Sequence, residues 1–407
     1  MSTFLEATDS SSTAPLQILD EVMALQDEIN DNRRWFHAHP ELSFQEVKTA
    51  EKISELLRSY GIEEIYENIG RTGVVAMIHG GQPGPCVALR ADMDALPITE
   101  TADIAYKSQN VGVMHACGHD GHMASLLGAA KVLFAQRNEL RGSVKLIFQP
   151  AEEGYAGARE MINDGCLGGD MGPEVDSIYG IHLWSFAALG VIGCTDGPIM
   201  AASDTFEIEV RGKGGHGAAP HGTVDAIVEA ASLVTNLQTI ISRNKDPQQS
   251  GVLTVGKING GYARNIIADK VVLCGTCRSF TPETQELIKN RMNDVCCGVA
   301  RMFGGEIDMN YQYGYPPTVN AYPENVTIVQ KAAAKVVGGE RSSGSFTTMG
   351  AEDFSFFLEK KPGCFFFVGC GLPGECRPHH KSVFDFDERG LLISASIFVH
   401  IIRDILL

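Results

Sequence analysis

The feature that most constrains the fold is an alternation of short, strongly apolar runs with longer helical segments. Four runs rich in Val, Ile and Leu have the length of buried strands, at residues 73–78, 86–89, 143–148 and 177–182. The segment 121–137 between them is apolar, Ala-rich and of helical length. Such an alternation is typical of an α/β sheet covered by helices on both faces. We therefore expect the chemistry to lie in loops at the strand ends.

The order of strands and helices changes near residue 197. An alternating strand at 206–210 is followed by an amphipathic helix at 224–241, two strands, a second helix and a last strand. This β-α-β-β-α-β order is that of the ferredoxin-like α/β sandwich. Since helical and strand-like segments resume afterwards, the sequence predicts a discontinuous first domain (1–197 and 314–407) that carries an inserted module (198–313).

The charge of the chain restricts its partners. A formal net charge of −17 with no basic block argues against nucleic acid and anionic lipid. The most apolar segment, 391–407, is interrupted by His400, Arg403 and Asp404, which predicts a buried C-terminal helix and no membrane span. The polar N-terminus lacks a signal-peptide pattern, and the irregular spacing of the eleven cysteines argues against a disulfide framework. We expect a cytoplasmic protein that acts on small molecules or peptides.

A dense group of metal-binding side chains lies at residues 115–122, in the sequence HACGHDGH. Cys117 and His119 form a Cys-x-His pair beside glycines at a predicted strand-to-helix junction, where both side chains face one point. Thiolate and imidazole together suit zinc, manganese, cobalt or nickel better than magnesium or calcium. A single histidine on an apolar face is usually structural, so it is the clustering that favours a metal site.

Adjacent carboxylates, Glu152 and Glu153, follow the strand at 143–148. Acids at a helix start are commonly a solvated pair that the helix dipole stabilises. At the end of a strand in an α/β sheet they have a second interpretation. One acid ligates a metal, while its neighbour takes a proton from metal-activated water and passes it to a leaving amine. The residues alone leave both interpretations open.

Isolated histidines complete the set of candidate metal ligands. His182 ends the strand at 177–182, and the pair His379-His380 stands near the C-terminus before Phe384. Each is a weak signal alone. Their value is that all these donors fall at loop positions that follow predicted strands.

Together these motifs resemble the M20 metallopeptidases, and within them the M20D amidohydrolases. That group includes hippurate hydrolases, N-acyl-amino-acid amidohydrolases and plant enzymes that release indole-acetic acid from its amino-acid conjugates. The resemblance covers nearly the whole chain and is carried by RRWFHAHPE, LRADMDALP, HACGHDGH, QPAEE, Gly180-Ile181-His182, GKGGHGAAPH, RNII at 264–267, and GAEDF. It implies a di-metal exopeptidase-like catalytic domain, with a mixed sheet between helices, and an inserted dimerisation domain.

The resemblance also implies roles for particular residues. Two divalent cations (Mn, Zn, Co or Ni) would be held by Cys117, His119, Glu153, His182 and His380. Glu152 would be the general base and acid, and Asp94 would orient the site. The chain departs from the family where it reads His379-His380-Lys381-Ser382, so His379 is the alternative to His380. Asp120 either acts like Asp94 or is a simple helix-start acid.

Residues of the inserted module extend the implied site. His216 lies in the glycine-rich stretch 212–217, and in related enzymes this histidine reaches the active site of the partner subunit and holds the substrate carbonyl or the tetrahedral intermediate. A homodimer with His216 acting in trans follows, the alternative being a plain hairpin. Asn265 corresponds to a position that binds the substrate carboxylate. Arg264 or Arg278 would contribute, with surface placement as the alternative.

These residues predict a metal-dependent amidohydrolase that cleaves a small N-acyl or N-aroyl amino acid, with Glu152, His216 and Asp94 as catalytic residues. The same machinery suits a dipeptide, a carbamoyl compound or hydrolytic deamination, which the sequence does not separate. A hydrolase with Cys117 as nucleophile would leave Glu153, His182 and His380 without a role. A non-catalytic binding protein conflicts with the retention of Glu152 and all five ligand positions.

Overall fold

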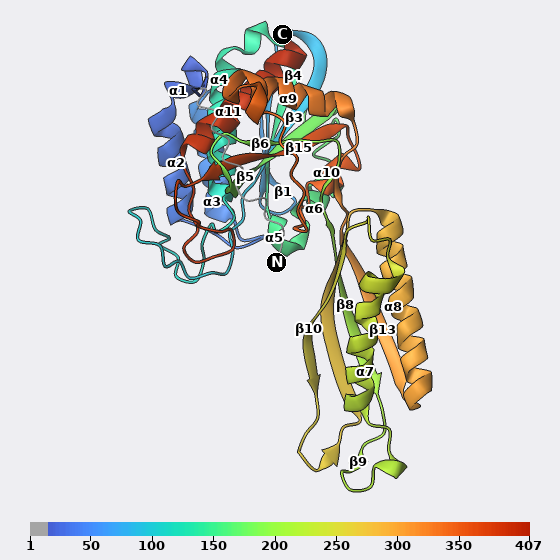
Figure 1. The fold of residues 1–407 in the computed structure, drawn as a ribbon. Coiled ribbons are helices and arrows are strands. Elements are labelled where there is room, and N and C mark those ends of the chain that lie inside the picture. The colour runs from blue at the N-terminus through green and yellow to red at the C-terminus, as the bar shows by residue number, and fades with distance from the viewer. Residues whose placement is uncertain (1–14) are drawn as a thin grey trace. The chain divides into compact units, whose positions relative to one another are not determined.

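The computed structural model describes residues 15–407, which form two compact units (Figure 1). The first unit contains the chain up to Gly197 together with Val319–Phe346 and Phe356–Leu407. The second contains Pro198–Thr318 and Thr347–Ser355. The short strands β7 (Gly197–Met200) and β14 (Thr318–Asn320) lie where the chain passes between the units.

The first unit is built on a seven-stranded mixed sheet with the strand order β1-β2-β4-β3-β5-β15-β6. Its centre is parallel, since β3 pairs in parallel with β4 and β5, and β5 with β15, whereas β1, β2 and β6 pair antiparallel to their neighbours. The strands are β1 (Ile65–Ile69), β2 (Gly73–His79), β3 (Gln82–Asp92), β4 (Arg141–Gln149), β5 (Ser177–Ala188), β6 (Ile192–Gly193) and β15 (Gly363–Gly371). The expected mixed sheet between helices is confirmed.

Helices enclose this sheet, and two of them are buried along almost their whole length. These are α4 (His119–Ala135) and α11 (Arg389–Leu406), which pack against each other and against strands β3 and β15. A helix covered on all sides has to be apolar all round, which explains the Ala-rich and Ile-rich sequences. The expected buried C-terminal helix is confirmed, and no helix of the described residues is long and apolar enough to cross a membrane.

Further helices and single helical turns connect these elements. They are α1 (Asp20–Met23), α2 (Gln26–Ala38), α3 (Val47–Ser59), η1 (Arg137–Glu139), α5 (Glu152–Tyr155), α6 (Gly157–Asn163), α9 (Pro323–Val337), η4 (Gly339–Arg341) and α10 (Ser355–Leu358).

The second unit is a four-stranded antiparallel sheet with the strand order β10-β12-β8-β13 and two helices, α7 and α8 (Figure 1). Along the chain its elements are β8 (Ala202–Arg211), α7 (Ala226–Thr239), β10 (Gly251–Gly260), β12 (Lys270–Ser279), α8 (Pro282–Phe303) and β13 (Glu306–Tyr315). Alternate residues of β8, namely Phe206, Ile208 and Val210, are buried in the core that α7 and α8 complete. The predicted β-α-β-β-α-β order is therefore confirmed.

Short strands and helices complete the second unit. Strand β9 (Gly215–His216) pairs antiparallel with β11 (Ile266–Ile267), and the short helices η2 (Pro220–Gly222) and η3 (Ile240–Asn244) flank α7. The later segment 347–355 also belongs to this unit, through a bridge between Met200 and Thr348 and a hydrogen bond from the Ala201 amide to Gly350. No pattern in the sequence indicates that residues 347–355 belong to the second unit.

Candidate metal centre

The candidate metal centre lies in the first unit, at the sheet edge where β3 and β4 end. Asp92 and Gln149 are opposite each other at the ends of these parallel strands, and His182 lies on the next strand, β5. Helix α4 starts at His119, after Gly118 in the left-handed region (φ +93°). Because parallel strands place their carboxyl ends at one edge, residues far apart in the sequence meet there.

The imidazole of His119 is oriented by Asp94. Its Nδ1 donates to the backbone oxygen of Asp94 at 2.8 Å. In the neutral ring Nε2 therefore carries the lone pair, and this buried atom has no hydrogen-bond partner. Burial alone would lower the pKa of His119, but Asp92 and Asp94 raise it to about 10. The surroundings of His119 thus strongly favour positive charge.

Cys117 and His182 face the same point as His119. Nδ1 of His182 donates to the backbone oxygen of Leu183 at 2.7 Å, which leaves Nε2 facing Cys117 Sγ at 3.5 Å. One donor atom from each of Cys117, His119 and His182 lies within 4.8 Å of the other two. That spacing is compatible with one cation about 2.0–2.3 Å from each donor.

A second group of donors shares the same sulfur. Cys117, Glu153 and His380 also place their donor atoms within 4.8 Å of one another, and Nε2 of His380 lies 3.3 Å from Glu153 Oε1. His379 points elsewhere, because its Nε2 accepts the Ser185 amide at 3.1 Å and its ring stacks on Trp184. Of the two histidines, His380 is the one that lies with the donor group.

The two groups share the Cys117 sulfur, and together they fit a pair of divalent cations. The buried atoms Glu153 Oε1 and His119 Nε2 both lack hydrogen-bond partners, which a bound cation would supply. Burial, together with the carboxylates of Glu153 and Glu152, holds the pKa of the Cys117 thiol well above its ordinary value. A cation bound at this sulfur therefore has to displace a proton.

Glu152 is buried beside these donors and is held through its backbone. The Glu152 amide donates to Asp94 Oδ1 and the Glu153 amide to Asp94 Oδ2, both at 3.0 Å. Donor atoms of His119, Glu152 and Glu153 lie within 4.8 Å of one another. Asp94 thus positions His119 and both glutamates without itself belonging to a donor group.

Sequence reasoning did not single out Asp92, which pairs with a histidine of the 115–122 cluster. Nδ1 of His122 donates to Asp92 at 2.6 Å, and Nε2 of His122 accepts the Leu183 amide at 2.9 Å. Both ring nitrogens of His122 are therefore occupied, whereas Asp92 also lies 3.8 Å from His119 Nε2. The available signal was the spacing in LRADMDALP, since Asp92 and Asp94 are two residues apart, as on one face of a strand.

Asp120 belongs to a separate, buried ion network. It accepts hydrogen bonds from Arg33 Nε at 2.9 Å and from His37 Nδ1 at 2.8 Å. Arg33 also pairs with Asp385 at 2.8 Å and Glu388 at 3.1 Å. Asp120 is an acid in the first turn of α4, and it joins that helix to Arg33 and His37 of α2.

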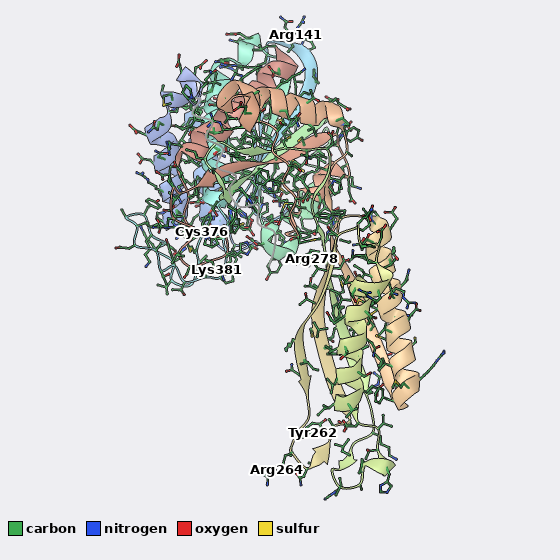
Figure 2. All side chains as sticks on the ribbon, viewed as in Figure 1. Arg141, Tyr262, Arg264, Arg278, Cys376 and Lys381 are labelled. Atoms are coloured by element: carbon green, nitrogen blue, oxygen red, sulfur yellow. The ribbon has the colours of Figure 1, made fainter. Side chains whose placement is uncertain are left out.

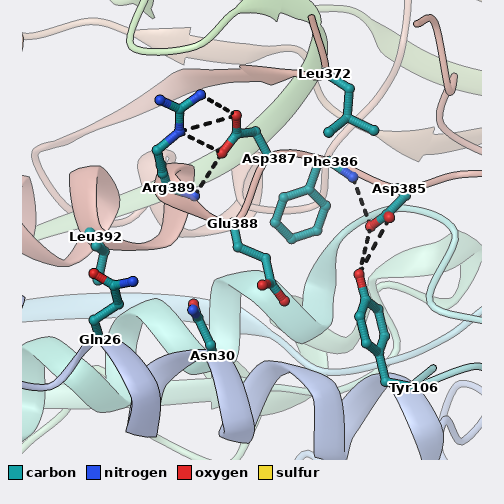
Figure 3. A pocket seen from close by; sticks show the side chains of 10 residues that line it. All are labelled: Gln26, Asn30, Tyr106, Leu372, Asp385, Phe386, Asp387, Glu388, Arg389 and Leu392. Carbon is teal, nitrogen blue, oxygen red and sulfur yellow. Dashed lines mark hydrogen bonds and ion pairs between the residues drawn. The ribbon is translucent and has the colours of Figure 1, made fainter. Parts of the chain in front are cut away.

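A cavity of about 430 Å³ lies beside this network (Figure 3). Asp385 and Glu388, two partners of Arg33, line it, and the Tyr106 hydroxyl donates to Asp385. Asp387 in the same wall is paired with Arg389 at 2.6 Å. No residue of the two donor groups lines this cavity, so it is distinct from the candidate metal centre.

Replacing Asp120 with Asn is expected to lower the free energy of unfolding of the first unit by about 3 kcal/mol, because a buried ion pair loses one partner. Although burial raises it, Arg33 and His37 hold the pKa of Asp120 well below its ordinary value. Asp120 therefore stabilises the fold above an unfolded pKa of about 4 and loses this effect as pH falls through the folded pKa. The difference from the wild type should persist from pH 7 to about pH 5 and narrow in stronger acid.

Tryptophan fluorescence during urea unfolding measures this effect in the first unit alone, because both tryptophans, Trp35 and Trp184, lie there. The exposed Asp103→Asn change is the matched control and should leave the midpoint unchanged. An Asp120→Asn midpoint equal to that of the control would contradict the structural role of the network.

The predicted substrate residues lie in the second unit and do not all come together. His216 in β9 pairs with Ile266, and the Gly217 amide donates to the Asn265 oxygen at 2.9 Å, so His216 and Asn265 are neighbours. Arg278 is opposite Ser203 at the far end of β12, whereas Lys270 at the near end is opposite Arg211. Figure 2 shows Arg264 and Arg278 at opposite ends of this unit. Within one copy of the chain, Arg278 therefore does not lie beside His216.

The α/β sheet, its buried thiol–imidazole–carboxylate donors and the ferredoxin-like module define the class of two-domain metallohydrolases. The family model of Peptidase family M20/M25/M40 matches residues 88–404. An N-acyl-L-amino acid amidohydrolase of Geobacillus stearothermophilus is 45% identical over 74% of this chain and 81% of its own length. The chain belongs to peptidase family M20/M25/M40.

Two further similarities extend along nearly the whole chain. An N-acetyl-L-cysteine deacetylase of Bacillus subtilis (strain 168) is 42% identical over 90% of this chain and 85% of its own length. The crystal structure of the Bacillus subtilis YXEP protein, a dinuclear metal-binding peptidase of the M20 family, has a TM-score of 0.82 and 34% identity, covering 94% of this chain and 99% of that one.

Proposed function

We propose that this protein hydrolyses the amide bond of a small N-acyl or N-aroyl amino acid at a centre of two divalent cations. The observation that carries the proposal is the pair of donor groups that share Cys117, with the buried carboxylate of Glu152 beside them. The names of the relatives, an N-acyl-L-amino acid amidohydrolase and an N-acetyl-L-cysteine deacetylase, support the substrate class.

The cations would be held by Cys117, His119, His182, Glu153 and His380. Bound there, they supply a water molecule of lowered pKa and polarise the substrate carbonyl. Thiolate, imidazole and carboxylate donors together favour Mn, Zn, Co or Ni over Mg and Ca.

Glu152 moves the protons of the reaction. Its carboxylate takes a proton from the attacking water and then donates it to the nitrogen of the leaving amino acid. The Asp94 carboxylate accepts the Glu152 amide, and the Asp94 backbone oxygen accepts Nδ1 of His119, so one buried residue positions both the base and a metal ligand. Asp94 acts as a positioning residue in this scheme.

His216 completes the site from a second copy of the chain. Its Nδ1 accepts the Ala218 amide at 3.1 Å, so the exposed Nε2 carries the proton in the neutral ring and donates to a substrate oxygen. Two features of the second unit support a homodimer. Strand β10 is at the edge of its sheet, and large apolar side chains are exposed nearby, at Ile227, Val228, Ile258, Tyr262 and Ile266.

The test is a hydrolysis screen of N-acetyl, N-benzoyl and indole-acetyl amino acids, with manganese, zinc or cobalt restored to metal-free protein. Released amino acid and released ammonia are measured separately. Metal-dependent release of the amino acid is expected. Release of ammonia without the amino acid would show that the enzyme is a hydrolytic deaminase instead. Activity on dipeptides or carbamoyl compounds alone would show that the proposed substrate class is wrong.

The close contact of Cys117 with His182 is also compatible with a second mechanism, in which the Cys117 thiolate is the nucleophile. Reactive cysteines have lowered pKa values, whereas burial and the neighbouring acids raise the pKa of Cys117. A chelator separates the two mechanisms. Activity that survives complete metal removal and is abolished by a thiol alkylator would favour the nucleophile.

His380→Ala is expected to halve the metal content while leaving the unfolding of metal-free protein within about 0.5 kcal/mol of wild type, because the His380 side chain is 53% exposed. His379→Ala should do the opposite. It removes a partly buried ring stacked on Trp184 and leaves the Ser185 amide without its acceptor, at a cost of about 2 kcal/mol. Metal analysis and tryptophan fluorescence measure both, and loss of metal from the His379 variant alone would reverse the assignment.

A further inference from the structure

The backbone that carries Glu152 is held by two buried carboxylates from different parts of the chain. Three consecutive amides, those of residues 151–153, each donate to a carboxylate oxygen. Asp94 accepts from Glu152 and Glu153, and Glu46 accepts from Ala151 through Oε1 at 2.9 Å. Glu46 lies immediately before α3, more than a hundred residues from Ala151 in the sequence. It touches no donor atom of the candidate metal centre in any of these contacts.

The loop held in this way has a conformation that its residues do not favour. Ala151 (φ +55°) and Ala156 (φ +58°) are both left-handed, although neither is glycine. Each such residue costs about 1–2 kcal/mol. The Gly157 amide closes the loop on the Ala151 oxygen at 3.0 Å, and a Cβ at Gly157 would lie 1.7 Å from the Pro150 oxygen. The loop shape is therefore imposed by its surroundings.

Glu46 is unusual among the buried acids of the first unit. Its side chain is fully buried, and its two hydrogen-bond donors, the Ala151 amide and the Thr72 hydroxyl at 2.6 Å, are both neutral. Burial, with the nearby Asp94, raises the pKa of Glu46 to about 7. Asp120, by contrast, is buried against a guanidinium. Burying an acid without a cationic partner is unfavourable, so fold stability alone does not account for Glu46.

We propose that Glu46 is a positioning residue for Glu152. By holding the Ala151 amide it keeps the left-handed turn from which Glu152 projects, and Thr72 keeps the Glu46 carboxylate aimed at that amide. This inference rests on the proposed role of Glu152 as the proton-transferring residue. Glu46 itself touches neither substrate nor metal in this role.

The test compares three variants. Glu46→Leu removes the acceptor with little change in volume, Glu46→Gln keeps an acceptor oxygen for Ala151, and Thr72→Val removes only the support of Glu46. The first readout is deuterium uptake of residues 150–157 in metal-free protein. Glu46→Leu should raise it strongly, Thr72→Val less, and Glu46→Gln hardly at all.

The second readout separates kcat from KM in the metal-loaded enzyme. Glu46→Leu should lower kcat by about 10- to 100-fold with little change in KM, because the base is misplaced while substrate contacts remain. Glu46→Gln should restore most of kcat. If Glu46→Leu does not fold, Thr72→Val has to show the same pattern with smaller amplitude.

Two results would overturn the inference. One is unchanged deuterium uptake and kcat in both Glu46→Leu and Thr72→Val. The other is a Glu46→Gln enzyme as impaired as Glu46→Leu, which would show that the charge and not the acceptor matters. Failure of the proposed function itself is seen separately, as near-normal turnover of a Glu152→Gln enzyme.

Discussion

The Glu152→Gln enzyme is expected to lose about 10²- to 10⁴-fold in kcat while binding its full complement of metal. Gln is nearly isosteric with Glu, so the backbone contacts of residue 152 with Asp94 should persist. What is lost is the carboxylate that accepts and returns a proton. Steady-state kinetics on the best substrate of the screen, with metal analysis of the same samples, measure both quantities.

The matched control is Glu160→Gln on helix α6, which changes an acid of the same region outside the donor groups. It should keep the turnover of the wild type. A Glu152→Gln enzyme with near-normal kcat would remove Glu152 from the mechanism. A variant that lost its metal as well would instead make Glu152 a ligand.

Cys117→Ala is expected to deplete both metal positions, because its sulfur belongs to both donor groups. One group then retains only the imidazoles of His119 and His182, and the other only Glu153 and His380, so the activity should fall at least as far as in the Glu152 variant. Removing His182 should deplete only one of the positions. Metal content measured after dialysis against metal-free buffer distinguishes the shared ligand from the unshared one.

Cys166→Ala is the control for the loss of a buried thiol, because Cys166 is buried and free but outside every donor group. It should retain the metal content of the wild type. Equal metal loss in the His182 and Cys117 variants would contradict a shared sulfur. Retention of both cations without Cys117 would contradict its role as a ligand.

The sequence predicted the architecture because both units have strong local signals. Apolar runs of strand length alternate with helices in the first unit, and turn-bounded alternation produces the β-α-β-β-α-β order of the second. The donors were recognisable by residue type and motif spacing, but only Glu153 closely follows a strand, since Cys117 lies just before α4 and His182 lies inside β5. The prediction that His182 ends its strand is therefore wrong, because β5 continues to Ala188.

Other assignments depended on which atom of a side chain is already occupied. His119 and His122 are equivalent in the sequence cluster, yet both nitrogens of His122 are hydrogen-bonded whereas Nε2 of His119 is free of such a bond. His379 and His380 are adjacent, but Nε2 of His379 accepts the Ser185 amide, whereas Nε2 of His380 lies 3.3 Å from Glu153 Oε1. Such differences come from neighbours that lie 30, 61 and 194 residues away in the sequence, which no local pattern contains.

By itself, the sequence determined the class of fold, the family and the kinds of donor that gather at the strand ends, because periodicity and motif spacing act over a few residues. Only the tertiary structure showed how those donors are divided between two groups. It made Cys117 common to two groups, assigned Asp120 to the buried Arg33, and joined Glu46 to Ala151. These are contacts between distant segments, and they exist only once packing has fixed the distances and directions of the side chains.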